Sequence, residues 1–292
     1  MSTAFGVAPD SSGQGCDAMT HRRVIASQWE NTGIITGLEV SGRQDLRYGV
    51  RPGAAVCSMG DADGMSIAWW DGAGSPCTEN TVDAGDSAYP RIDAVYIISH
   101  TGSPDNLVHV KVAQGTPSAS PAEPRVEAGG QVLAYMMLPA GATSTAAASR
   151  WGEVAYAVPY GAGLGSLGYA ESRTAGGPTW QSAEQPQLSL TTRYVPTDRR
   201  VDVVWTYRAS TSSGVGSFIA FLYVDGQRVS DGLDECPVFE PWARQQLRWS
   251  GVALSGQAVH TVSVAIKPAT VRPRWQWQGF RSLEVVDGSV TV

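Results

Sequence analysis

Tryptophans near the C-terminus have the residue types and the spacing best suited to binding a ligand. Trp275 and Trp277 alternate with Arg274 and Gln276, so an extended backbone would place both indoles on one face and the guanidinium and amide on the other. Flat aromatic faces beside such donors can stack on a sugar ring and hydrogen-bond to it. Trp242 is a further candidate for the same contact. The alternative is that these side chains pack in a core or at a subunit interface, where Trp and Arg are enriched.

Catalytic motifs do not appear in the sequence. None of the four histidines is spaced for a zinc site with another His or Cys. We expect His260 to open a strand and His100 to lie at a turn, both on the surface. No GxSxG, HExxH or P-loop occurs. We therefore expect neither an enzyme nor a protein with a metal or cofactor.

Two pairs of acids deserve comparison with glycosidase carboxylates, namely Asp83 with Asp86 and Asp234 with Glu235. Glycosidase carboxylates must lie roughly 5 to 10 Å apart in space, which proximity in the sequence does not establish. Acids in loops are usually solvated, so we rank a glycoside hydrolase last among the candidate functions.

Asp93 is an acid within an apolar run, two residues after Arg91. Burying its carboxylate without a donor would cost several kcal/mol, on the order of the penalty for an unpaired polar group. We expect Arg91 or a backbone N–H to satisfy it, unless its face is solvated. A catalytic role is the alternative, but no His or second acid lies at a supporting spacing.

Cysteine and calcium patterns both allow two interpretations. The four cysteines contain no CxxC, and either all are free thiols or Cys57 and Cys77 are joined across neighbouring strands. The segment from Asp61 to Gly64 predicts a turn. It also has the beginning of a calcium loop, but the acid required at the twelfth position is missing.

Composition indicates an all-β protein. Apolar residues make up 42% of the 292 residues and charged residues only 16%, as in a folded chain with large cores. The 33 glycines and 17 prolines separate short β-branched and aromatic runs, which is typical of many short strands. The net charge of −6 and the lack of a basic face argue against nucleic-acid binding. No apolar run approaches the roughly 18 residues of a membrane helix, so we expect no membrane insertion.

The segment 89–138 organises the first half of the chain. Alternating apolar residues at 92–98 and 107–113, separated by a polar break, predict a β-hairpin. A proline-rich crossing then leads to a third strand at 132–138. Before this segment we expect further strands, which lie at residues 34–40, 48–50, 54–58 and 65–70.

The chain divides into four parts on these patterns. Residues 1–30 form an arm and a short helix with Thr20 as its N-cap, and residues 31–158 form an N-terminal β domain. Residues 159–180 contain a formal GxGxxG, but no helix can follow it, so we interpret them as a Gly-rich linker. Regular alternation and hairpin turns over residues 181–292 predict a C-terminal β-sandwich that is jelly-roll-like. Its last hairpin pairs 283–286 with 289–292.

Short segments in the first half carry a resemblance to a known family. They lie at residues 22–25, 32–40, 50–56, 90–95, 114–117 and 120–124. Their sequences, order and spacing resemble those of minor tail and upper-baseplate proteins of long-tailed bacteriophages, especially phages of actinobacteria. The resemblance covers residues 15 to about 140 and does not extend to the C-terminal half.

This resemblance implies a structural protein of the virion, at the tail tip or baseplate. The N-terminal half would attach to other tail or baseplate proteins, and the β-sandwich would face the host or neighbouring subunits. Such appendages are usually homotrimers, so a second partner is the chain itself. The first residues lack an export signal, which fits assembly in the host cytoplasm. The alternative from another class is a stand-alone protein that binds carbohydrate, such as a host surface glycan.

Overall fold

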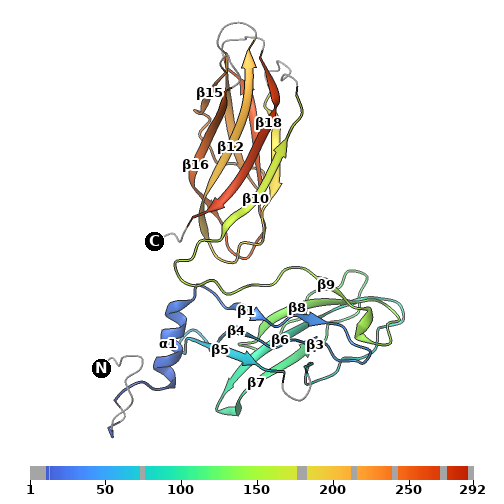
Figure 1. Ribbon diagram of the computed structural model, residues 1–292. Coiled ribbons are helices and arrows are strands. Elements are labelled where there is room, and N and C mark those ends of the chain that lie inside the picture. The colour runs from blue at the N-terminus through green and yellow to red at the C-terminus, as the bar shows by residue number, and fades with distance from the viewer. Residues whose placement is uncertain are drawn as a thin grey trace. The chain divides into compact units, whose positions relative to one another are not determined.

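The computed structural model describes residues 11–12, 14–72, 76–175, 183–211, 216–238, 243–269 and 275–288. It is an all-β protein with one short α-helix, as predicted (Figure 1). The chain forms two compact units, which we call unit 1 (Met1–Tyr160) and unit 2 (Gly161–Val292). No helix in the described part of the chain is long and apolar enough to cross a membrane.

Helix α1 (Ala18–Gln28) begins three residues earlier than the predicted cap implies. Asp17 is the N-cap, and its Oδ1 accepts a hydrogen bond from the backbone N–H of Thr20 at 2.7 Å. Thr20 therefore lies inside the first turn, and the prediction of Thr20 as N-cap is wrong. No side chain of α1 is buried, and the helix contacts strand β5 (Met65–Trp70). Because so short a helix is marginal alone, this contact is needed to hold it.

Unit 1 contains two larger antiparallel sheets and a two-stranded ribbon. The first sheet has the order β1-β4-β5, in which β4 (Gly53–Ser58) lies between β1 (Gly33–Gly37) and β5. The ribbon pairs β2 (Val40–Ser41) with β3 (Gly49–Val50). The predicted single strand at 34–40 ends at Gly37, because Gly37 and Leu38 both adopt positive φ, at 64° and 61°, which turns the chain out of the extended conformation.

The predicted hairpin and third strand form the second sheet of unit 1. Its order is β7-β6-β8-β9, where β6 pairs with both β7 and β8. The bounds are β6 (Arg91–Thr101), β7 (Ser103–Ala113), β8 (Gln131–Leu138) and β9 (Ser149–Trp151), and a 3-10 turn, η1 (Thr145–Ala147), precedes β9. Buried residues of β1, β4, β6, β7 and β8 form one apolar core. The hairpin prediction is thus confirmed.

Asp93 lies within this core and is fully satisfied. Its Oδ1 accepts hydrogen bonds from Arg91 Nε at 2.9 Å and from the Gly115 backbone at 3.1 Å. Its Oδ2 accepts one from the Tyr48 hydroxyl at 2.8 Å. The Arg91 side chain is 2% exposed and that of Asp93 is 0% exposed. Arg91 also donates to the Ala84 carbonyl at 2.9 Å. Both expected donors, Arg91 and a backbone N–H, are therefore present.

The other two open interpretations in unit 1 are also resolved. Cys57 and Cys77 are free thiols, as are Cys16 and Cys236. Burial raises the pKa of Cys57 to about 12, which keeps this thiol protonated. The segment before β5 is a turn, in which the backbone N–H of Asp63 donates to the Gly60 carbonyl at 3.0 Å.

Unit 2 begins with a strand where a linker was predicted. The chain passes from unit 1 to unit 2 after Tyr160, but β10 (Gly165–Ser172) pairs with β18 (Trp275–Asp287) and buries Leu167. Residues 165–172 are therefore part of the sandwich, and the predicted linker 159–180 is wrong over this stretch. The glycines allow close packing: a Cβ on Gly163 would lie 2.9 Å from the Gly288 carbonyl oxygen.

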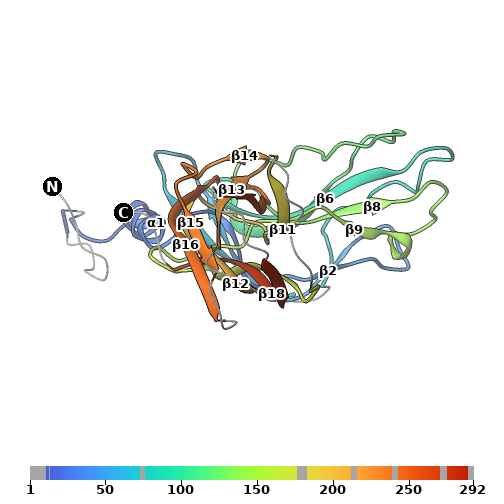
Figure 2. The same cartoon turned by 90° about the horizontal axis from the view of Figure 1, so that it is seen from above.

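Two sheets of unit 2 enclose its core. One has the order β10-β18-β12-β16, and the other has the order β11-β17-β13-β14, with β15 also paired to β13. Figure 2 shows these two layers from above. The remaining bounds are β11 (Gln185–Thr191), β12 (Arg199–Thr211), β13 (Gly216–Val224), β14 (Gln227–Arg228), β15 (Glu235–Val238), β16 (Arg244–Leu254) and β17 (Thr261–Pro268).

The strand pairing of unit 2 is nested. In chain order the first long strand pairs with the last, β10 with β18, and then β11 pairs with β17, β12 with β16 and β13 with β15, all antiparallel. A long hairpin wrapped into two facing sheets has this arrangement, which is the jelly roll, and the two-residue β14 is an addition to it. The predicted partner strand at 289–292 lies outside the described residues, and 283–286 pair instead with β10 and β12.

Candidate functional site

Trp277 occupies the core of the jelly roll and not its surface. The side chain is 4% exposed, and its ring makes edge-on contacts with Trp205, Tyr207 and Phe218 at centroid distances of 6.2, 6.1 and 5.7 Å. Its place in β18 turns it toward the facing sheet, so it has almost no free surface for a ligand. The prediction of a sugar contact at Trp277 is wrong, and the core alternative describes it.

The other predicted contact residues are not brought into one site by the described structure. Gln276, which precedes Trp277 in β18, is exposed on the opposite face from Trp277. Arg274 and Trp242 lie outside the described residues, as does the side chain of Trp275. A ligand contact at these three residues therefore stays a prediction.

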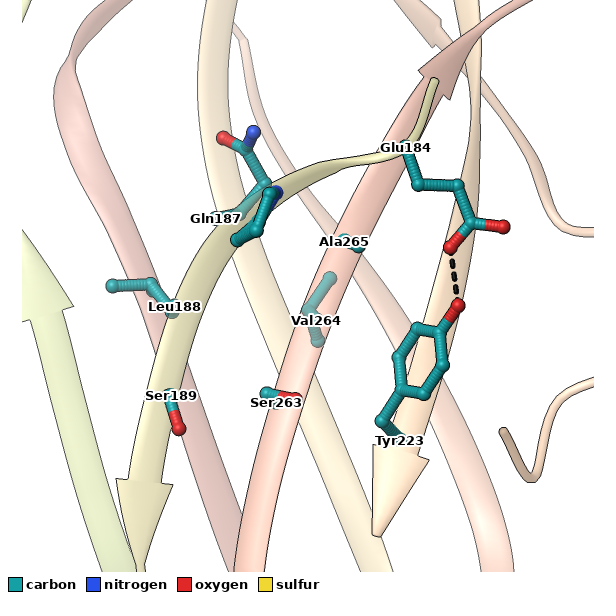
Figure 3. Close-up of a pocket in the computed structure, with 9 residues that line it drawn as sticks. Glu184, Gln187, Leu188, Ser189, Tyr223, Ser263, Val264 and Ala265 are labelled. Carbon is teal, nitrogen blue, oxygen red and sulfur yellow. Dashed lines mark hydrogen bonds between the residues drawn. The ribbon is translucent and has the colours of Figure 1, made fainter. Parts of the chain in front are cut away.

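A different place on the jelly roll has the form of a binding site. The outer face of β11, β17 and β13 is hollowed over about 450 Å³ (Figure 3). This volume falls within the range of small-molecule sites, about 300 to 1,000 Å³. Its floor is formed by two small residues of β17, Ser263 and Ala265. Around them lie longer or polar side chains, namely Glu184, Gln187, Ser189 and Tyr223.

Side-chain size along β17 explains why the face is hollow. Val262, Val264 and Ile266 are buried in the core, so the residues between them point outward. Those outward residues, Ser263 and Ala265, are small. The flanking strands carry longer side chains, with Tyr223 on β13 on one side of them, so the middle of the sheet lies lower than its sides (Figure 3).

Tyr223 and Glu184 form one side of the hollow. The Tyr223 hydroxyl donates a hydrogen bond to Glu184 Oε2 (Figure 3), and Arg228 Nη1 lies 3.7 Å from Glu184 Oε1. The hydrogen bond to the carboxylate, together with burial, raises the pKa of Tyr223. This side of the hollow thus presents a phenol ring beside a carboxyl group that accepts one hydrogen bond and lies near a guanidinium.

Gln187 forms the other side and connects the hollow to the core. It lies at a bulge in the pairing of β11 with β17. Its Oε1 accepts a hydrogen bond from Arg281 Nη1 at 2.6 Å, and its Nε2 donates to the Gln185 carbonyl at 3.1 Å. The Arg281 guanidinium in turn lies 4.8 Å from the Trp277 ring centroid, and burial lowers its pKa. Trp277 therefore supports the hollow indirectly, through Arg281.

The chemistry of the hollow suits binding. A phenol ring, an amide, two serine hydroxyls and a carboxylate are the groups that stack on a sugar ring and hydrogen-bond to its hydroxyls. Hydrolysis of a glycoside requires two carboxyl groups, whereas Glu184 is the single acid among the described residues that line the hollow.

The acids considered as glycosidase carboxylates have other partners. Asp234 Oδ2 accepts a hydrogen bond from Trp249 Nε1 at 2.7 Å, and Glu235 accepts one from the Ser217 hydroxyl. Asp83 Oδ2 accepts a hydrogen bond from Gln114 Nε2 at 3.0 Å. Asp86 Oδ1 accepts backbone N–H groups at 2.8 and 2.9 Å. These contacts describe acids that order turns and strand ends.

Histidine positions differ from the expectation at two places. His260 is buried, and its ring nitrogens lie 2.7 Å from Asp225 Oδ2 and 2.9 Å from the Ser255 carbonyl, so its assignment to the surface is wrong. His100 lies within β6 and its side chain is only 7% exposed, so its assignment to a turn on the surface is wrong as well. His100 and His109, which sequence spacing did not connect, have ring centroids 4.6 Å apart. Hairpin pairing brings them together, and the break between the two apolar runs was the signal in the sequence that such pairing would occur.

Comparison of the chain with protein-family models and with curated proteins finds no match. The fold and the hollow therefore define its class by themselves. It is an all-β protein of two units, the second of which is a jelly roll with an open polar and aromatic depression on one face.

Proposed function

We propose that this protein is a non-catalytic component of a phage tail tip or baseplate. Unit 1 joins other tail proteins, and the jelly roll presents its hollow to a glycan of the host surface. The observation that carries the proposal is the division of the chain after Tyr160. The segment that resembles tail proteins, residues 15 to about 140, lies wholly within unit 1, so the jelly roll is a separate unit with a binding face of its own.

The chemistry of the hollow supports the second half of the proposal. Jelly rolls are common in viral capsids and lectins, although fold alone does not assign a function. Here the hollow adds an aromatic ring with polar groups on both sides, in a space of about 450 Å³ that is open to solvent. A protein that holds a ligand in such a place works by affinity and needs no reacting groups.

Labelled antibodies against unit 1 test the location. Applied to virions of a phage whose genome encodes this chain, they are expected to label the tip of the tail. The control is the same antibody after its binding sites have been blocked by competition with the purified protein. Label on the capsid, or no label on intact and disrupted virions, would contradict the proposal.

Glycan arrays test the hollow itself. Tyr223→Ala is expected to weaken glycan binding by about fivefold, since a ring contact contributes about 1 kcal/mol. Tyr169→Ala is the matched control, because the exposed Tyr169 of β10 also donates to a glutamate, Glu171, at 2.9 Å, but outside the hollow. Binding that is unchanged in Tyr223→Ala and in Gln187→Ala would place the ligand elsewhere.

A homotrimer belongs to the same proposal, because tail appendages assemble by symmetric association. Light scattering of the purified protein at micromolar concentration is expected to give three times the mass of the chain, which is 30.9 kDa. A monomer under these conditions would contradict the trimer while leaving glycan binding to be measured separately.

A further inference from the structure

We propose that unit 1 has a binding site for a divalent transition metal, with Zn²⁺ as the reference ion, at the β6–β7 hairpin. The ligands are His100, Asp105 and His109. One ligand atom from each of these side chains lies within 4.8 Å of the ligand atoms of the other two. The site lies outside the hollow of unit 2, and it does not depend on the proposed function.

Hairpin register brings these three residues together. Ile98 of β6 is paired with His109 of β7, and the pairing shifts between Ser99 and Thr101. Between these two pairs β6 contributes one residue, His100, whereas β7 contributes four, residues 104–107, so β7 bulges there and Asp105 lies beside His100. Asp105 precedes His109 by four residues on β7, so the strand repeat of two puts both on one face.

Distances among the ligand atoms are close to those of a metal site. Asp105 Oδ2 lies 3.1 Å from His109 Nε2, and Asp105 Oδ1 lies 3.3 Å from His100 Nδ1. Two donors on one tetrahedral Zn²⁺ lie roughly 3.4 Å apart, given metal–ligand bonds of about 2.1 Å. The carboxylate therefore already stands between the two rings at the required spacing.

Each histidine has a second carboxylate on its other ring nitrogen. His109 Nδ1 lies 2.9 Å from Glu79 Oε2, and His100 Nε2 lies 3.2 Å from Glu127 Oε1. A histidine that binds a metal almost always donates its remaining N–H to such a group, which orients the ring and makes the ligand nitrogen more basic. With His109 Nδ1 and His100 Nε2 protonated and donating to Glu79 and Glu127, the lone pairs of His109 Nε2 and His100 Nδ1 face Asp105.

His100 supplies an independent observation. Its side chain is 7% exposed, and its Nδ1 is inaccessible to solvent without a hydrogen-bond partner, although Asp105 is near. A buried polar atom without a partner is costly, and such atoms in native proteins mark ion sites or functional positions. A metal between His100 and Asp105 satisfies this nitrogen.

The ligand set indicates the kind of ion. Two imidazoles and one carboxylate suit Zn²⁺ and its neighbours Co²⁺, Ni²⁺ and Cu²⁺, whereas Ca²⁺ and Mg²⁺ prefer oxygen ligands alone. Three protein ligands leave a coordination position for water or for a group of a neighbouring molecule. Without a metal, the same side chains form a network of ion pairs, and this is the alternative outcome of the test.

Metal analysis after equilibrium dialysis of the full chain against Zn²⁺ tests the proposal. Wild type is expected to retain one Zn²⁺ per chain, and His109→Ala and Asp105→Asn to retain none. His21→Ala, which changes an exposed histidine of α1, is the matched control and is expected to retain the ion. Glu79→Gln and Glu127→Gln should each weaken binding by about 10- to 100-fold. No retained Zn²⁺ in wild type, or equal retention in His109→Ala, overturns the site.

Visible absorption of the Co²⁺ form of wild type keeps the test decisive if a variant fails to fold. A site with two imidazoles and a carboxylate is expected to show the intense bands of four- or five-coordinate Co²⁺. A spectrum equal to that of Co²⁺ in buffer overturns the proposal.

Discussion

The central strands of the two units carry different chemistry. In unit 1, β6 places the buried pair Arg91 and Asp93 in the interior, tied to a hydroxyl, a carbonyl and a backbone N–H. In unit 2, β12 places Trp205 there, and the rings of Phe218 and Trp277 lie against it. Unit 2 has a buried ion pair too, Arg199 with Asp287 at 3.6 Å, but at the end of the sandwich, where Arg199 also bonds to the Ala162 carbonyl.

The difference follows from strand length and connections. The main strands of unit 2 are long, so alternate side chains alone supply the apolar inner face of each sheet and non-directional packing suffices. Unit 1 has shorter strands in its first sheet and long irregular segments, whose backbone groups need partners. Directional bonds from Arg91 and Asp93 hold such segments to β6, and the close approach leaves no room for a side chain at Gly115, where a Cβ would lie 1.9 Å from the Ile92 carbonyl oxygen.

Asp93→Ala is the strongest test of this contrast. It leaves the buried Arg91 without its carboxylate partner and removes the acceptor of the Tyr48 hydroxyl and the Gly115 N–H. We therefore expect a loss of about 5 kcal/mol of unfolding free energy in unit 1. Calorimetry of the full chain should show the unit 1 transition at much lower temperature and the unit 2 transition unchanged.

Asp45→Ala is its matched control, because Arg43 and Asp45 are also two residues apart but exposed. A surface pair contributes little, so this variant should leave both transitions in place. If Asp93→Ala were as stable as Asp45→Ala, the buried charges of unit 1 would not hold its core.

Trp277→Ala is the corresponding test for unit 2. Removing a buried indole leaves a cavity and strips the ring from beside Arg281, and we expect a loss of about 4 kcal/mol confined to unit 2. The calorimetric transition of unit 2 should shift, while that of unit 1 should not.

Trp69→Ala serves as the control because Trp69 of β5 is exposed, and little change is expected. If Trp277→Ala left the free energy of unfolding of unit 2 unchanged, the indole would not be part of the core, and Trp277 would again be a candidate for ligand contact.

A pH-dependent effect at the β13–β14 turn is the smallest of the three. Asp225 accepts hydrogen bonds from His260 Nδ1 at 2.7 Å and from the Thr261 backbone at 2.8 Å, and the bond to His260 is the main reason that its pKa is lowered. A carboxyl with a lowered pKa in the folded state adds stability above its unfolded pKa of about 3.9 and loses it as the pH falls further.

Asp225→Asn removes this contribution. Because the Asp225 side chain is 51% exposed, solvent reduces the effect, and we expect less than about 1 kcal/mol at pH 7. Urea unfolding of unit 2 should show wild type more stable than the variant at pH 7 and the two converging below pH 4, the range set by the ordinary carboxyl pKa. A difference that is the same at every pH would assign the effect to the turn backbone and not to the charge.

Several features of the fold were accessible from local sequence patterns. Alternation at 92–98 and 107–113 predicted the hairpin of β6 and β7, and the carboxylate inside that run predicted a donor such as Arg91. Alternation also missed β10, because its glycines carry no apolar signal and its pairing with β18 spans more than a hundred residues of chain. The N-cap was misplaced because Asp17 and Thr20 both have capping side chains, and only the observed bond to Asp17 distinguishes them.

By itself the sequence determined the all-β class, the hairpin at the centre of unit 1 and the division of the chain near Tyr160, since these depend on residue types a few positions apart. Only the tertiary structure decided that Trp277 faces inward, that His100 meets His109, and that Tyr223 and Glu184 border one hollow. The physical reason is that a period of two shows which side chains share a face of a strand. Which face becomes the interior, and which distant strands become neighbours, depends on the packing of whole sheets.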